Sequence, residues 1–117
     1  MNLEQFREYC IRKIGVTEGF PFDDKTLVFK VSRKIFALVS IDHFQFVNLK
    51  CDPERSIELR EQYAAIRPAY HMNKKHWNSV SLNADVDKKL FLELVDHSYH
   101  LVFQSLSKKD RSELALG

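Results

Sequence analysis

The sequence predicts one α+β domain in two layers, with an antiparallel sheet and helices packed mainly on one of its faces. The chain has 117 residues, which is the size of a single domain, and no linker, repeat or break in composition divides it. Apolar residues recur at helical intervals in three segments and alternate in the runs between them, in the order α-β(3)-α-β(2)-α. Hydrophobic residues make up 44% of the chain, which is enough to fill one core without disulfides or a metal.

The first segment is expected to be a helix that begins after Asn2. This residue can cap the helix, and Gln5 follows at the spacing of a capping box. Gly15 suits the left-handed position that ends a helix. Residues 16–24 contain a glycine and a proline and are expected to form an ordered loop. The inward side of the helix comprises Leu3, Phe6, Cys10 and Ile14.

Three alternating or β-branched runs then predict an antiparallel meander. The strands are expected at 26–31, 35–41 and 44–51. In the third strand, Asn48 and Lys50 fall on the face opposite Val47 and Leu49, because successive side chains point to opposite sides of a sheet.

A second helix is expected to begin after Asp52. The aspartate can cap it, Pro53 fits its first turn, and Glu54 complements the helix dipole. The helix should reach about Tyr63, and Pro68 prevents any later continuation.

The C-terminal part is expected to hold a hairpin and a long helix. Strands at 69–72 and 77–82 would flank a turn at 73–76, and Asp85 or Asp87 would open the helix. The polar residues 107–117 are expected to form a frayed tail of this single domain, which spans 1–117. The inward stripe of the helix comprises Phe91, Leu94, Val95, Ser98, Leu101, Val102 and Leu106.

Charge is segregated along the chain although the net charge is only +2. Residues 25–51 carry a net +4 and residues 63–84 a net +3, which leaves −5 for the remainder. The cationic segments are mostly those predicted to form the sheet. A cationic sheet backed by acidic helices is the expected result.

The cysteines and the lack of apolar segments predict a cytoplasmic protein. Cys10 and Cys51 are far apart and form no C-x-x-C motif, so both are expected to be buried, reduced thiols. No N-terminal stretch resembles a signal peptide, and no apolar run approaches the ~18 residues of a membrane span.

Several sequence blocks resemble the MmcQ/YjbR family. Residues 47–54 read VNLKCDPE and resemble its NLKCDPE block, and residues 70–78 read YHMNKKHWN and resemble its GYHMNKKHWN block. Ala69 stands where that block has glycine, and His100 lies outside the pattern. Further matches, in the same order along the chain, are at 20–22, 29–31, 34–38 and 96–99.

The resemblance implies both a fold and a function. The fold is α-β(3)-α-β(2)-α, shared with secretion-chaperone-like domains, which agrees with the order read from the residues. The function is that of a bacterial "double wing" DNA-binding protein without enzymatic activity. Because this function is inferred from the fold, it is an expectation to test.

The segment 70–78 is the first candidate binding site. It offers cations for phosphate, amides for base edges and flat rings for stacking, so as a basic hairpin it could act as a wing. Alternatively, its rings anchor the hairpin to the core while the lysines are solvated turn residues. The candidate residues are Tyr70, His71, Asn73, Lys74, Lys75, His76, Trp77 and Asn78.

A second candidate is the sheet face that carries Asn48 and Lys50, with Lys30 on another strand of the meander. Together with the hairpin, these side chains could form a polar concave site. The alternative is an ordinary solvated sheet face.

Neither a metal site nor a catalytic site is predicted. His97 and His100 are three residues apart on a helix, but no cysteine pair or known metal-ligand motif accompanies them, so His97 is expected to be a hydrogen-bonded packing residue. No cofactor-binding glycine loop or nucleophile motif occurs. Cys51 is expected to be inert, although a helix beginning at Pro53 could lower its pKa.

Two hypotheses therefore remain. In the first, the domain is a non-enzymatic module that binds nucleic acid, DNA being the expected partner. In the second, it binds a protein or a small ligand at the same sheet face. Salt dependence separates them, because phosphate contacts weaken steeply as salt is added.

Overall fold

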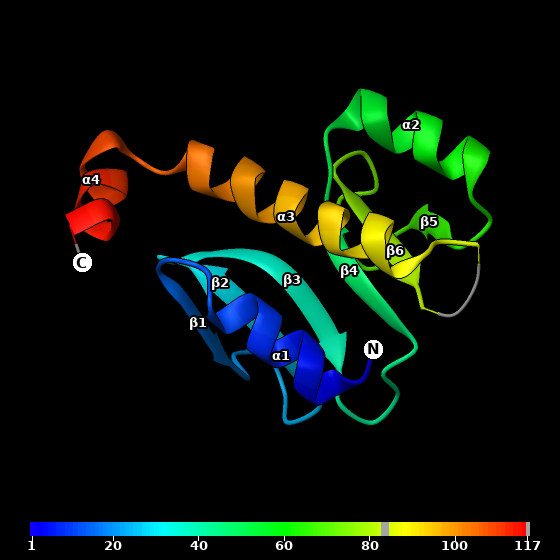
Figure 1. Ribbon diagram of the computed structural model, residues 1–117, viewed down its shortest axis with the longest axis horizontal. Coiled ribbons are helices and arrows are strands. Elements are labelled where there is room, and N and C mark those ends of the chain that lie inside the picture. The colour runs from blue at the N-terminus through cyan, green and yellow to red at the C-terminus, as the bar shows by residue number, and fades with distance from the viewer. Residues whose placement is uncertain (83–84, 117) are drawn as a thin grey trace.

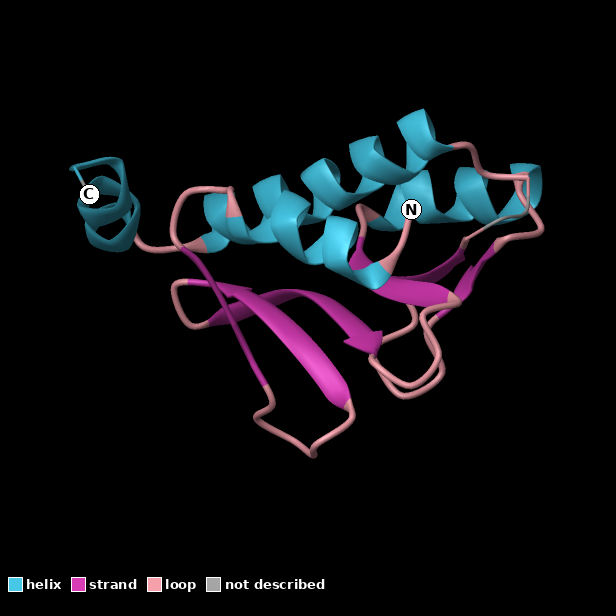
Figure 2. Ribbon diagram, turned by 60° about the horizontal axis from the view of Figure 1, so that its bottom comes forward, coloured by secondary structure: helices cyan, strands magenta, loops and turns pink. Residues whose placement is uncertain are grey.

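The computed structural model describes residues 1–82 and 85–116, and it has the predicted α+β architecture. A six-stranded antiparallel sheet, in the order β1-β2-β3-β4-β6-β5, is covered by helices on one face (Figure 2). The elements, shown in Figure 1, are α1 Leu3–Ile11, β1 Val16–Gly19, β2 Thr26–Val31, β3 Lys34–Ser40, β4 Phe46–Lys50, α2 Pro53–Gln62, β5 Ile66–Pro68, β6 Trp77–Ser81, α3 Lys88–Ser105 and α4 Lys108–Leu116.

The helix starts follow the capping signals in the sequence. The Asn2 side chain accepts from the Gln5 N–H, and the Gln5 side chain accepts from the Asn2 N–H, so the capping box is confirmed. Asp52 caps α2, and of the two aspartates considered for α3, Asp87 is the cap. Gly15 has the expected left-handed conformation, with φ of 77°, but it lies in the connection after α1 and not directly at the helix end.

Three local predictions were wrong. The loop expected at 16–24 begins with the edge strand β1, whose Val16 pairs with Val31 of β2. The strand expected at 69–72 lies earlier, at Ile66–Pro68, because the chain after Pro68 leaves the sheet in a turn closed by the Met72 N–H and the Ala69 carbonyl. Within the segment expected to fray, residues 108–116 form α4, while residue 117 lies outside the described residues.

The core lies between the sheet and helices α1 and α3. Phe6, Phe29 and Phe36 are fully buried, and their rings, with those of Phe91 and Tyr99, pack in edge-to-face and tilted pairs. Such contacts bury large apolar areas and fix the helices on this face of the sheet.

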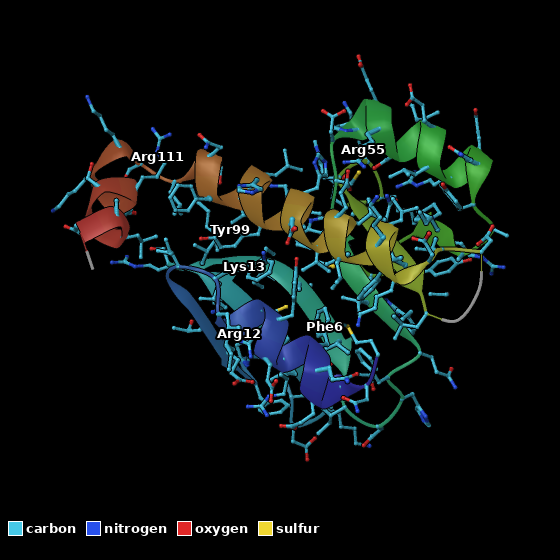
Figure 3. All side chains as sticks on the ribbon, in the orientation of Figure 1. Phe6, Arg12, Lys13, Arg55, Tyr99 and Arg111 are labelled. Atoms are coloured by element: carbon cyan, nitrogen blue, oxygen red, sulfur yellow. The ribbon has the colours of Figure 1, made fainter. Side chains whose placement is uncertain are left out.

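Polar contacts also attach the helices to one another and to the sheet. Lys13, just after α1, and Asp96 on α3 form an ion pair, and the Lys13 ammonium lies 5.3 Å from the centre of the Tyr99 ring (Figure 3). Ser98 of α3 accepts the Lys50 N–H at 2.8 Å and donates to the Phe36 carbonyl. Strand β3 has an irregular register at this point, so Ser98 satisfies backbone groups that the neighbouring strands do not pair.

Candidate binding face on the open side of the sheet

One face of the sheet is left uncovered by the helices, and its side chains follow from the strand register (Figure 2). Alternate residues point away from the helices. We call this surface the open face. It comprises Val28 and Lys30 on β2, Ile35 and Leu38 on β3, Phe46, Asn48 and Lys50 on β4, Trp77, Ser79 and Ser81 on β6, and Arg67 on β5.

Lys30 and Lys50 lie on the same face, as the sequence suggested, and the register also brings them to the same end of it. Lys30 pairs with Ile35, and Lys50 pairs with Trp77. The two lysines lie on strands separated by β3, so their backbones are roughly 10 Å apart at the usual strand spacing. Asn48 lies one row further along β4, where its side-chain oxygen accepts the Ser79 hydroxyl.

The loop 69–76 does not extend as a hairpin but folds back over the open face. Asn73 shapes it, because its side chain accepts the Lys75 N–H and its carbonyl accepts from His76 and Trp77. The His76 carbonyl in turn accepts the Cys51 N–H at 2.8 Å. Asn73 and the His76 backbone therefore have structural roles. The sequence alone indicated both residues only as candidates for binding.

Asn78 was predicted as a binding residue, and this prediction was wrong. It is 2% exposed and faces the helices, because it pairs with the inward-pointing Leu49. Its oxygen accepts from Nε of Arg60 at 2.7 Å, and its nitrogen donates to Ser56 at 3.2 Å. Arg60 also donates to the carbonyls of Lys74 and Trp77, so α2 holds the loop in place.

Folding of this loop creates two clefts on the open face. The first, of about 410 Å³, we call the β3–β4 cleft, and the second, of about 470 Å³, the β5–β6 cleft. Both volumes are in the range of small-ligand sites, ~300–1,000 Å³. The β3–β4 cleft is lined by Phe22, Ile35, Leu38, Phe46, Asn48, His71 and Met72, and the β5–β6 cleft by Phe46, Arg67, Pro68, Tyr70, Ser79 and Ser81.

Phe46 borders both clefts, and sequence analysis did not select it. Its side chain is 41% exposed, and nearby Phe22 and Tyr70 are 66% and 77% exposed. The Lys74 ammonium lies 5.7 Å from the centre of the Tyr70 ring. The signal for Phe46 was present, since it shares the alternation that put Asn48 and Lys50 on one face.

The carboxylate at the rim of the β3–β4 cleft belongs to Asp23. It accepts hydrogen bonds from the backbone N–H groups of Lys25 and Thr26 at 2.9 and 2.7 Å, which lower its pKa. Asp23 is therefore ionised at neutral pH and is occupied by its own loop.

His97 and the two cysteines are in structural positions. Nε2 of His97 accepts the Asp52 N–H at 3.2 Å, as expected of a packing residue. Burial raises the pKa of both the Cys10 and the Cys51 thiols, so the alternative of a lowered Cys51 pKa was wrong. Both are free thiols. Within 1–82 and 85–116, no three His, Cys, Asp or Glu side chains are grouped to hold a metal ion.

Comparison with known proteins places this fold and these sequence blocks in one family. Residues 12–101 match the model of the YjbR family. The chain belongs to the YjbR family. The resemblance noted from the sequence is thereby confirmed.

Relatives of this YjbR-family chain span nearly its whole length. The uncharacterised protein YjbR of Escherichia coli K12 is 32% identical over 97% of this chain and 98% of its own. YbdF of Escherichia coli O157:H7, also described as uncharacterised, is 39% identical over 84% of this chain and 81% of its own. A crystal structure of a Deinococcus radiodurans protein with a DUF419 domain has a TM-score of 0.92 and 41% identity, covering 99% of this chain and 89% of that one.

One further finding concerns the helices. In the part of the chain that the structure describes, none is both long enough and apolar enough to cross a membrane.

Proposed function

We propose that this YjbR-family protein is a non-enzymatic module that binds nucleic acid at the open face of its sheet. The observation that carries the proposal is the row formed by Lys30 and Lys50 at one end of this face, with Trp77 beside Lys50. Two cations roughly 10 Å apart can contact phosphates of one strand, while the flat ring of Trp77 on the far side of Lys50 can contact a sugar or a base.

The loop 69–76 adds charge to this region. Lys74 and Lys75 are exposed on it, and Arg67 borders the β5–β6 cleft. The segments that supply these cations carry a net +7, whereas the rest of the chain carries −5. Since the acids lie largely on helices of the other layer, phosphate would be attracted to one side of the domain and repelled from the other.

The experiment measures binding by fluorescence anisotropy at several salt concentrations, on duplex and single-stranded DNA. Four lysine contacts to a duplex would give a log–log salt slope of about −3 to −4, from ~0.9 per phosphate. We expect Lys30→Gln/Lys50→Gln and Lys74→Ala/Lys75→Ala to weaken binding and each to reduce the slope by about 2.

A charge-matched control is available on α4. Lys108 and Lys109 are both exposed at its start, beyond the end of the sheet (Figure 1). Lys108→Gln/Lys109→Gln removes the same charge and should leave affinity and slope nearly unchanged. Absence of binding by the wild type, or an equal effect of the control pair, would contradict the proposal.

A protein or small apolar ligand is the second candidate, and the lining of the β3–β4 cleft favours it. Phe22, Leu38 and Met72 supply an apolar surface there, and the ionised Asp23 at the rim would repel phosphate. Such a ligand would bind with little salt dependence. Binding of this kind, with no affinity for DNA, would replace the nucleic-acid proposal.

A further inference from the structure

We propose that the nucleic acid held by the open face is single-stranded, and that Phe46 and Tyr70 stack on its bases. This inference rests on the proposed function and names the form of its ligand. It differs from a wing that enters the groove of a duplex.

The first reason is the shape of the loop 69–76. A wing must project from the sheet to reach into a groove, but this loop is attached to the domain by Arg60, which donates to the Lys74 and Trp77 carbonyls. Ala69 within it is fully buried, and His71 and Met72 lie against the β3–β4 cleft. The loop is therefore a wall of the open face and not an extension from it.

The second reason is the exposure of aromatic rings. Phe46 and Tyr70 are 41% and 77% exposed, and both border the β5–β6 cleft. A base in a duplex has both of its flat faces covered by neighbouring bases, whereas an unpaired base offers a face to an aromatic side chain. Rings exposed on an open sheet therefore complement a single strand better than a duplex.

The third reason is the position of Phe46 between the clefts. Because Phe46 borders both of them, its ring can contact one base in each. Lys30 and Lys50 lie at the opposite end of the strands from Phe46 and can hold phosphates, and Arg67 lies beside Tyr70 in the β5–β6 cleft. A strand that crosses the face can therefore place bases on the rings at one end, with a phosphate at Arg67 beside them, and further phosphates on the two lysines at the other end.

The test compares binding of a fluorescein-labelled oligothymidylate of about 15 nucleotides with binding of a hairpin duplex of similar length. This length is chosen because sheet surfaces that bind single strands cover ~4–16 nucleotides. We expect the wild type to bind the single strand at least about tenfold more tightly, which is the contribution of one or two stacked bases. Replacing either ring, by Phe46→Leu or Tyr70→Leu, should weaken single-strand binding by about 5- to 150-fold.

Two further variants separate stacking from a general loss of structure. Phe46→Trp keeps a flat ring and should retain single-strand binding, whereas Phe46→Leu keeps apolar volume and should lose it. Lys74→Ala should reduce the salt slope by about 0.7, the value per phosphate of a single strand, without removing the preference for single strands. Circular dichroism of each variant checks that the fold is intact.

The outcomes distinguish this inference from the function on which it rests. Equal affinity for duplex and single strand, together with unchanged binding by Phe46→Leu and Tyr70→Leu, would overturn the single-strand proposal and leave nucleic-acid binding standing. Tighter binding to the duplex would do the same. If the wild type binds neither oligonucleotide, both proposals are wrong.

Discussion

The two faces of the sheet use aromatic side chains in opposite ways. On the helix-covered face, Phe6, Phe29 and Phe36 are fully buried and pack against one another or against α3. On the open face, Phe46 is 41% exposed, and Phe22 at the cleft rim is 66% exposed. Burial of apolar area explains the first group but not the second. The open face therefore has apolar surface that the fold itself does not require, which makes it the part of the sheet available for a ligand.

The largest expected loss of stability comes from a substitution on the helix-covered face. Phe36→Ala would leave a cavity between the sheet and Tyr99 of α3, and it should lower the free energy of unfolding by about 3–5 kcal/mol. Phe46→Ala removes the same number of atoms from a partly exposed site and should cost less than about 1 kcal/mol. Urea denaturation of both variants measures the difference. Similar losses would mean that the open face contributes to stability as the covered face does.

The elements that were predicted correctly are those with local signals. Asn2, Asp52 and Asp87 cap their helices through their own side chains, so a few neighbouring residues are enough to locate each start. Strand β1 was missed because it depends on pairing with β2 along one edge, and its sequence, VTEG, has little strand character of its own. Helix α4 was missed for a related reason: its polar sequence gives no apolar stripe, although Leu114 contacts the turn at Gly15.

The candidate site was predicted only in part, because some of its residues follow a local pattern and others depend on distant contacts. Alternation along β4 correctly placed Asn48 and Lys50 on the open face, and applied one residue earlier it would also have found Phe46. In β6 the same rule puts Asn78 with Val80 on the covered face, but the unusual composition of 70–78 favoured treating all its polar residues as exposed. The fold of the loop and its attachment to Arg60 depend on contacts between distant residues, which no local pattern contains.

A smaller loss of stability is expected for a polar side chain on the helix-covered face than for a buried ring. Asn78→Ala would leave Arg60 Nε and the Ser56 hydroxyl without this partner, and it should lower the free energy of unfolding by about 1–3 kcal/mol. Ser79→Ala, one residue along on the open face, should cost less than about 1 kcal/mol, since water can replace its bond to Asn48.

The Asn78 variant also tests whether the covered face positions the clefts. Arg60 would lose the contact that orients it toward the Lys74 and Trp77 carbonyls, so amide hydrogen exchange of the loop 69–76 should accelerate. Unchanged exchange in the loop, or equal losses of stability in the two variants, would show that the open face does not depend on this attachment.

The smallest expected effect is a pH dependence that arises in the helical layer. Burial lowers the pKa of His97 below its usual value, because the charged ring loses water. The Arg55 guanidinium lowers this pKa further, whereas the carboxylates of Glu93 and Asp52 raise it by less than the total lowering. The unfolded chain takes up a proton at His97 near pH ~6.5, whereas the folded protein does so only at lower pH. Between these values the unfolded state binds more protons, so the free energy of unfolding must decrease as the pH falls.

Protonation would also remove the acceptor for the Asp52 N–H at the start of α2. His97→Gln keeps a side-chain acceptor but cannot be protonated in this range. Urea denaturation at about pH 7.5 and about pH 5.5 should therefore show a larger loss of stability for the wild type than for the variant. Equal losses in the two proteins would mean that His97 is protonated as easily in the folded as in the unfolded state. The pH dependence would then have to come from groups other than His97.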